Sequence, residues 1–230
     1  MSELINFQVE PNQIWEEIET STVQQAALDI GTAIARDINR SRLAAGLSAE
    51  GEEGPSPELL EPADAFVKVF GRPVRFLRKA SSMGPTGFWG QAILRDLIWV
   101  HSNARHSSAD DRIAAVSNRP QFAVHELGHA FENMLLDAVG QKKGRNSLPN
   151  SLANRTAGFF HLGRFQQSKD LGRGEIFADM FIGWVYDRWQ LKNTNLLDGP
   201  LTDAGTARKK FMDDIMVDLI DAAMTHNKNP

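Results

Sequence analysis

Hydrophobic residues recur with the period of an α-helix near both ends of the chain. From Asn12 to about Leu43 they return at multiples of four, which predicts one long amphipathic helix or two shorter helices broken near Thr20–Thr22. Two adjacent apolar rows follow Thr202 and Asp203, either of which suits the N-cap of a C-terminal helix. The apolar positions are Ile14, Ile18, Ala26, Ile30, Ile34 and Ile38 in the first segment, and Phe211, Met212, Ile215, Met216, Leu219, Ile220 and Ala223 in the second.

Between these segments the pattern changes to short runs that are typical of strands. Val74–Leu77 and a stretch within Ala92–Val100 are rich in β-branched and aromatic residues, so each predicts one strand. A run of Gly, Glu and Pro predicts a linker over residues 51–62. We therefore expect an N-terminal helical segment (1–50) packed on a core (63–230) of α+β class, mainly helical, with a small antiparallel or mixed sheet.

A further helical segment carries the sequence AVHELGHAF. A favourable N-cap and a terminal glycine predict a helix over Arg119–Val139. At about 100° per residue, His125, Glu126 and His129 share one edge of this helix, and the apolar residues lie opposite. That edge is either a metal site or an ordinary solvated face. The apolar residues are Val124, Leu127, Phe131, Met134, Leu135 and Ala138.

The HELGH pattern suits the chemistry of zinc. Imidazoles at positions i and i+4 can both reach one tetrahedral zinc ion, and Glu126 between them can contact a water bound to that ion. Gly128 has no side chain, so another segment can approach the helix closely at this point. Because the chain has no cysteine, a zinc ion would need histidine and carboxylate ligands.

A catalytic zinc ion usually has three protein ligands, so the third has to come from elsewhere in the chain. The next histidine, His161, lies beyond the short spacing of metzincins. Glu175 opens a predicted helix over Glu175–Trp189, and Asp179 follows one turn later on the same face. These acids are candidates for the third ligand and for a carboxylate that orients a ligating histidine. Alternatively, they are acids that the helix dipole favours at an N-terminus. The predicted buried residues of this helix are Ile176, Phe177, Met180, Phe181, Trp184 and Val185.

Together, HELGH and EIFAD resemble the paired motifs of the gluzincin zinc metallopeptidases, of which thermolysin is the familiar member. A core of one short strand and two helices is equally compatible with small intracellular relatives such as the ImmA/IrrE-like peptidases. The resemblance covers less than half of the chain, and the two motifs are farther apart than in thermolysin. It implies that His125, His129 and Glu175 bind Zn2+, that Glu126 is the general base, and that Asp179 orients a ligand from the second shell.

Peptide-bond hydrolysis in a protein or peptide substrate is the activity that this resemblance implies, with Glu126 taking a proton from a zinc-bound water. The substrate is expected to pair with the strand in Ala92–Val100. The segment Gln141–Arg173 forms either a flap over the site or a plain surface loop. Tyr186 lies about 16 Å along its helix from Glu175, too far to stabilise the oxyanion. Candidates for that role are His161, Arg164 and Arg173.

Composition and charge narrow the function classes further. The net charge of −4 and the absence of a clustered basic excess give no reason to expect nucleic-acid binding. Neither a secretory signal nor an apolar run of membrane-spanning length is present, so we expect a cytoplasmic protein without a membrane partner. The alternative to an enzyme is a non-catalytic regulatory or interaction protein that zinc stabilises. The sequence does not indicate an oligomeric state.

Overall fold

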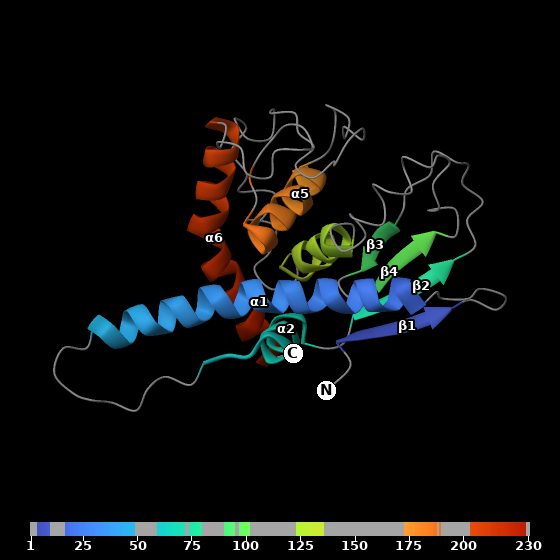
Figure 1. The fold of residues 1–230 in the computed structure, drawn as a ribbon, viewed down its shortest axis with the longest axis horizontal. Coiled ribbons are helices and arrows are strands. Elements are labelled where there is room, and N and C mark those ends of the chain that lie inside the picture. The colour runs from blue at the N-terminus through green and yellow to red at the C-terminus, as the bar shows by residue number, and fades with distance from the viewer. Residues whose placement is uncertain are drawn as a thin grey trace.

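A computed structural model describes the fold over residues 4–9, 17–48, 59–71, 74–79, 90–94, 97–101, 123–135, 173–187, 189 and 203–228. These residues are mainly helical, as the sequence predicted (Figure 1). Between β4 and α5, an unlabelled yellow-green helix spans residues 123–135, which we call the motif helix because it carries HELGH. The labelled elements are β1 (Ile5–Val9), α1 (Glu17–Ser48), α2 (Pro62–Phe70), β2 (Val74–Lys79), β3 (Gly90–Leu94), β4 (Leu97–His101), α5 (Arg173–Tyr186) and α6 (Asp203–Lys228).

The four labelled strands form one sheet in the order β1-β2-β4-β3. β1, β2 and β4 are parallel, and β3 runs antiparallel to β4. A strand was predicted within Ala92–Val100, and the structure has two there, because the chain reverses so that Leu94 pairs with Leu97. The charged pair Arg95-Asp96 interrupts the apolar residues between the two strands, a signal that the prediction did not use. The pattern also gave no indication of β1.

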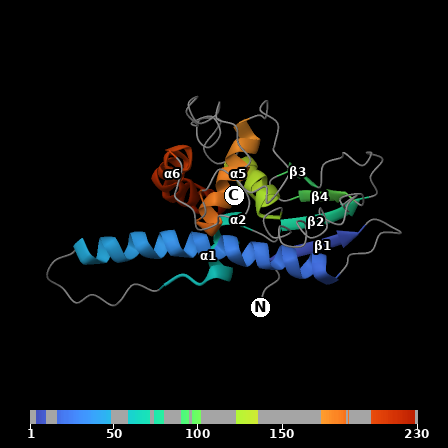
Figure 2. The ribbon, with the colours of Figure 1, turned by 45° about the horizontal axis from the view of Figure 1, so that its top comes forward.

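Helix α1 runs without a break through Thr20–Thr22 and continues past Leu43 to Ser48. The β-branched and hydroxyl residues near position 20 lower helix propensity by only a few tenths of a kcal/mol each, which is too little to end a helix of this length. Figure 2 shows α1 crossing the molecule beside the sheet and the other helices. The short helix α2 was not predicted, although Pro62 in its first turn and Gly71 at its end, with φ of 73°, are typical helix boundaries.

The predicted start of α5, Glu175, is closer to the observed bound than the predicted end is. The prediction extended the helix to Trp189, but it ends at Tyr186, where Asp187 takes a left-handed backbone conformation with φ of 49°. The chain then turns so that the Trp189 ring lies over Gly183, within 3.1 Å of where a Cβ atom would stand. Trp189 therefore follows the end of α5 and is buried because its ring packs back against the helix. The six residues of α5 that were predicted to be buried are all buried.

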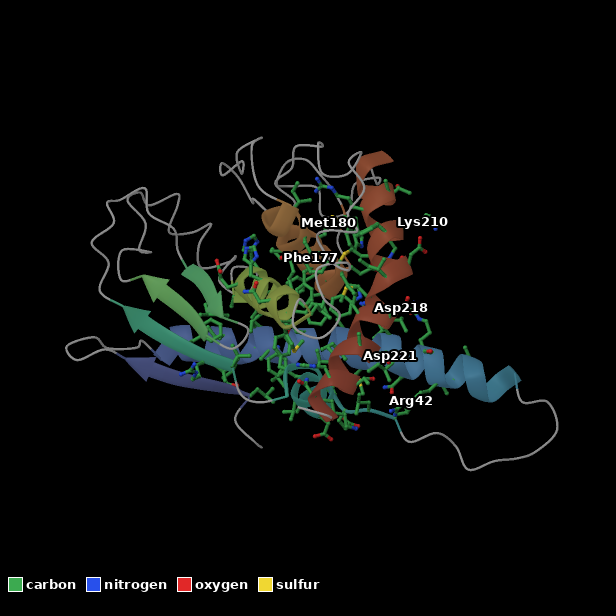
Figure 3. The ribbon with its side chains drawn as sticks, turned by 180° about the vertical axis from the view of Figure 1, so that it is seen from behind. Arg42, Phe177, Met180, Lys210, Asp218 and Asp221 are labelled. Atoms are coloured by element: carbon green, nitrogen blue, oxygen red, sulfur yellow. The ribbon has the colours of Figure 1, made fainter. Side chains whose placement is uncertain are left out.

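A single hydrophobic cluster joins α1, α2, the sheet, the motif helix, α5 and α6. In Figure 3, Phe177 and Met180 lie between α5 and α6, whereas Lys210, Asp218 and Asp221 stand on the exposed side of α6. The motif helix lies between α5 and the sheet, with β3 as the nearest strand in Figures 1 and 2. Within the part of the chain that the structure describes, no helix has the length and apolar character needed to cross a membrane.

Candidate functional site

The motif helix is held by its apolar side, which the sequence pattern predicted. The Phe131 ring packs against Phe181 of α5, with centroids 5.3 Å apart, and against Phe70 of α2 at 6.3 Å. These contacts fix the helix between two others. The helix is described over residues 123–135, and the remainder of the predicted span Arg119–Val139 lies outside the described residues. Its buried apolar residues are Ala123, Val124, Leu127, Ala130, Phe131, Met134 and Leu135.

The polar edge of the motif helix is enclosed by the fold. His125 is 9% exposed and Glu126 is 6% exposed, while His129 is partly buried. The interpretation of an ordinary solvated face is therefore wrong for His125 and Glu126. Burying a carboxylate or an imidazole costs free energy unless it is paired, and each of the three residues takes part in interactions within the fold.

The two imidazoles lie side by side, one helical turn apart. Their ring centroids are 4.8 Å apart, and their planes are nearly perpendicular at 86°. Imidazoles at positions i and i+4 of a helix have the spacing at which both can bind one metal ion. This pair, with carboxylates but no thiolate nearby, suits a zinc ion by the chemistry of its donors.

Glu132 is a second buried carboxylate on the motif helix. It follows His129 by three residues and is only 1% exposed. A carboxylate this deeply buried has a partner within the fold, as Glu132 does. Its place on the same helix makes Glu132 the competitor of Glu175 for the third ligand. It lies beyond both imidazoles along the helix axis, however, which is a poor position to complete a tetrahedron.

Gly128 confirms the prediction that another segment approaches the motif helix closely. A Cβ atom built at Gly128 would lie 3.2 Å from the Phe181 Cβ atom and 3.3 Å from the Ala178 Cα atom, both in α5. The helix that begins with the EIFAD motif therefore packs on the HELGH helix directly. Residue 175 precedes Ala178 by three positions, which is about 4.5 Å along the axis of α5. The contact thus lies within one turn of both motifs.

The side chains of several predicted site residues lie outside the part of the chain that the structure describes. The backbones of Glu175 and Asp179 lie in α5, but their side chains are outside the described residues, as is that of Arg173, which is the first residue of the helix and not part of the preceding loop. His161 and Arg164 lie wholly outside them. Among the side chains that are described, no three His, Asp or Glu residues come together in a way that could hold a metal ion.

Tyr186 makes a contact that the sequence did not suggest. Its hydroxyl donates a hydrogen bond to Asp29 Oδ2 of α1 at 2.9 Å. Two residues earlier, the Trp184 indole Nε1 donates to Asp37 Oδ2 at 2.7 Å. Sequence analysis missed both aspartates. The two acids are eight residues apart in the first helix, which also contains other polar residues, so the sequence did not distinguish them.

Comparison of the chain with known protein families, with curated proteins and with solved structures gave no match. The residues of the motif helix and the packing of α5 against it are therefore the observations that bear on function.

Proposed function

We propose that this protein is a zinc-dependent peptidase of the gluzincin type, with His125, His129 and Glu175 as the metal ligands. The observation that carries the proposal is the pair of imidazoles on a buried helix edge, with ring centroids 4.8 Å apart, beside the buried carboxylate of Glu126. The close contact at Gly128 supports it, because Glu175 precedes Ala178, one of the contact residues, by less than one helical turn.

The residues divide the chemistry between them. A zinc ion bound at this site would polarise the scissile carbonyl and lower the pKa of the attacking water. Glu126 accepts the proton that the water loses and transfers it to the nitrogen of the leaving amine. Its burial excludes bulk water, which keeps the carboxylate available to the reacting groups. Asp179, one turn after Glu175, would accept a hydrogen bond from the second ring nitrogen of a ligating histidine.

An extended peptide substrate would pair with β3. β4, which begins at Leu97, pairs with β2 on one side and with β3 on the other. It therefore has no free edge at which a substrate strand could pair. β3 has a described partner only on its β4 side. It is also the strand nearest to the motif helix (Figure 2). Backbone hydrogen bonds along its outer edge would hold the substrate in extended form.

The deciding experiment separates zinc binding from chemistry. Purified wild-type protein should contain about one zinc ion per chain and cleave members of a quenched fluorescent peptide library. Glu126→Gln should keep its zinc and lose activity by on the order of 10²–10⁴, because the amide cannot accept the water's proton. His129→Ala should lose most of the zinc.

Matched controls come from outside the motif helix. Glu61→Gln changes an exposed carboxylate, and His226→Ala removes a histidine of α6. Neither should change zinc content or turnover. Zinc in the wild-type protein without cleavage of any peptide would instead favour the non-catalytic, zinc-stabilised protein. Full zinc content in His129→Ala would exclude the motif helix as the site.

A further inference from the structure

The described residues of α5 are buried continuously from Ile176 to Ala178 and from Met180 to Val185. Successive residues of a helix are about 100° apart, so these buried positions lie on every side of the axis, unlike a single apolar stripe. The rotation of α5 about its axis is therefore set by specific contacts. One is the packing of Phe181 and Ala178 on Gly128.

Hydrogen bonds to α1 are further contacts of this kind, at the C-terminal end of α5. Trp184 Nε1 donates to Asp37 at 2.7 Å in the buried interior, and the Tyr186 hydroxyl donates to Asp29 at 2.9 Å. Arg36 strengthens the first of these contacts. Its Nε atom donates to Asp37 Oδ1 at 2.8 Å, and its Nη2 atom donates to the Trp184 carbonyl oxygen at 3.3 Å.

The two anchors lie on opposite sides of α5. Positions 184 and 186 are about 200° apart around the helix, and Asp29 and Asp37 are about 12 Å apart along α1. Figures 1 and 2 both show α5 meeting α1 at this end. Rotation of α5 would change the distance of both donors from their acceptors, so the pair of bonds restrains this rotation in addition to the packing on Gly128.

Position 186 shares a face with the EIFAD acids. It follows Glu175 by eleven residues and Asp179 by seven, and both intervals return to within about 20° of the same direction. The bond from Tyr186 to Asp29 therefore fixes the direction of the face on which positions 175 and 179 lie.

We propose that Asp29 and Asp37 are positioning residues of the zinc site. They act through Tyr186 and Trp184 to set the rotation of α5, and thereby the geometry with which the α5 acids meet the two imidazoles of the motif helix. This inference rests on the proposed function, because it presumes that α5 supplies a ligand. It gives α1, which lies outside both motifs, a part in metal binding.

Tyr186→Phe tests the inference with the loss of a single hydroxyl. Zinc affinity is measured by competition with a chelator, well below the unfolding temperature of each variant, and the visible spectrum of the Co2+-substituted protein reports the coordination geometry. We expect zinc binding to weaken roughly 10-fold, the lower end for a residue that orients a ligand, and the Co2+ bands to change. Asp29→Ala should have the same effect, and the double variant should be no worse than either single one.

The control is Asn39→Ala, which removes contacts of α1 that do not involve α5. Asn39 accepts a hydrogen bond from Leu60 N at 2.8 Å and donates one to Leu60 O at 3.1 Å. This variant should unfold at a lower temperature with zinc affinity and Co2+ spectrum unchanged. If Tyr186→Phe and Asp29→Ala behave like this control, the bond is only structural and the inference is wrong. Failure of the wild-type protein to bind zinc would instead overturn the proposed function, and this inference with it.

Discussion

Replacing Gly128 with alanine adds one methyl group where the motif helix meets α5. The new Cβ atom would lie 3.2 Å from both the Cβ and Cδ1 atoms of Phe181 and 3.3 Å from the Ala178 Cα atom. Carbon atoms in favourable contact are about 3.5–4.0 Å apart, so α5 has to move by a few tenths of an ångström. The Ala178 atom is backbone, so this movement displaces the helix and not one side chain.

Two opposing terms set the magnitude of the effect. Alanine is favoured over glycine in a helix interior by about 0.8–1.0 kcal/mol. Inserting a methyl group into a well-packed core costs about 1–3 kcal/mol. We therefore expect Gly128→Ala to lower the free energy of unfolding by about 0–2 kcal/mol, with weaker zinc binding because the first turn of α5 is pushed away.

The free energy is measured by urea unfolding with a chelator present, since bound zinc would add its own stabilisation to the folded state. Gly31→Ala is the comparison, because its Cβ atom would lie 2.1 Å from the Pro62 carbonyl oxygen. That clash forces α1 and α2 apart by more than about 1 Å, and it should destabilise the protein more than Gly128→Ala does. A gain of about 1 kcal/mol in Gly128→Ala, the full helix propensity, would refute the close packing of the two helices.

Two further predictions concern charge and ligand identity. The hydrogen bond from Lys209 lowers the pKa of Asp187 from its ordinary value of 3.8, although partial burial acts in the opposite direction. The ionised Asp187 therefore stabilises the folded state fully above pH 3.8, and this stabilisation is lost as the pH falls through the lowered pKa. For this exposed pair, Asp187→Asn should cost about 0.2–1 kcal/mol at pH 7 and nothing near pH 2, measured by urea unfolding. Glu175→Ala should abolish tight zinc binding while Glu132→Gln retains it, and the reverse result in chelator competition would remove the gluzincin assignment.

The sequence determined those elements whose pattern is complete within one segment. The helical period predicted the buried residues of the motif helix and α5 within the described residues, because the order of residues along a helix shows which positions are apolar. In α6 one of the two predicted rows is buried, whereas Phe211 and Ile215 of the other are only partly buried. Gly128 was a local signal of the same kind, since the lack of a side chain allows close approach whatever the partner is. Residue types and spacing likewise identified HELGH as a candidate zinc site.

Only the tertiary structure decided the relations between segments. It paired β3 with β4 and β2 with both β1 and β4, because strand pairing depends on distant partners that local pattern does not encode. Burial of His125 and Glu126 also required other elements to cover a polar edge, which the helix alone does not specify. The hydrogen bonds that Asp29 and Asp37 accept from α5 join residues more than 140 positions apart, so only the tertiary structure, which brings α1 and α5 together, shows them.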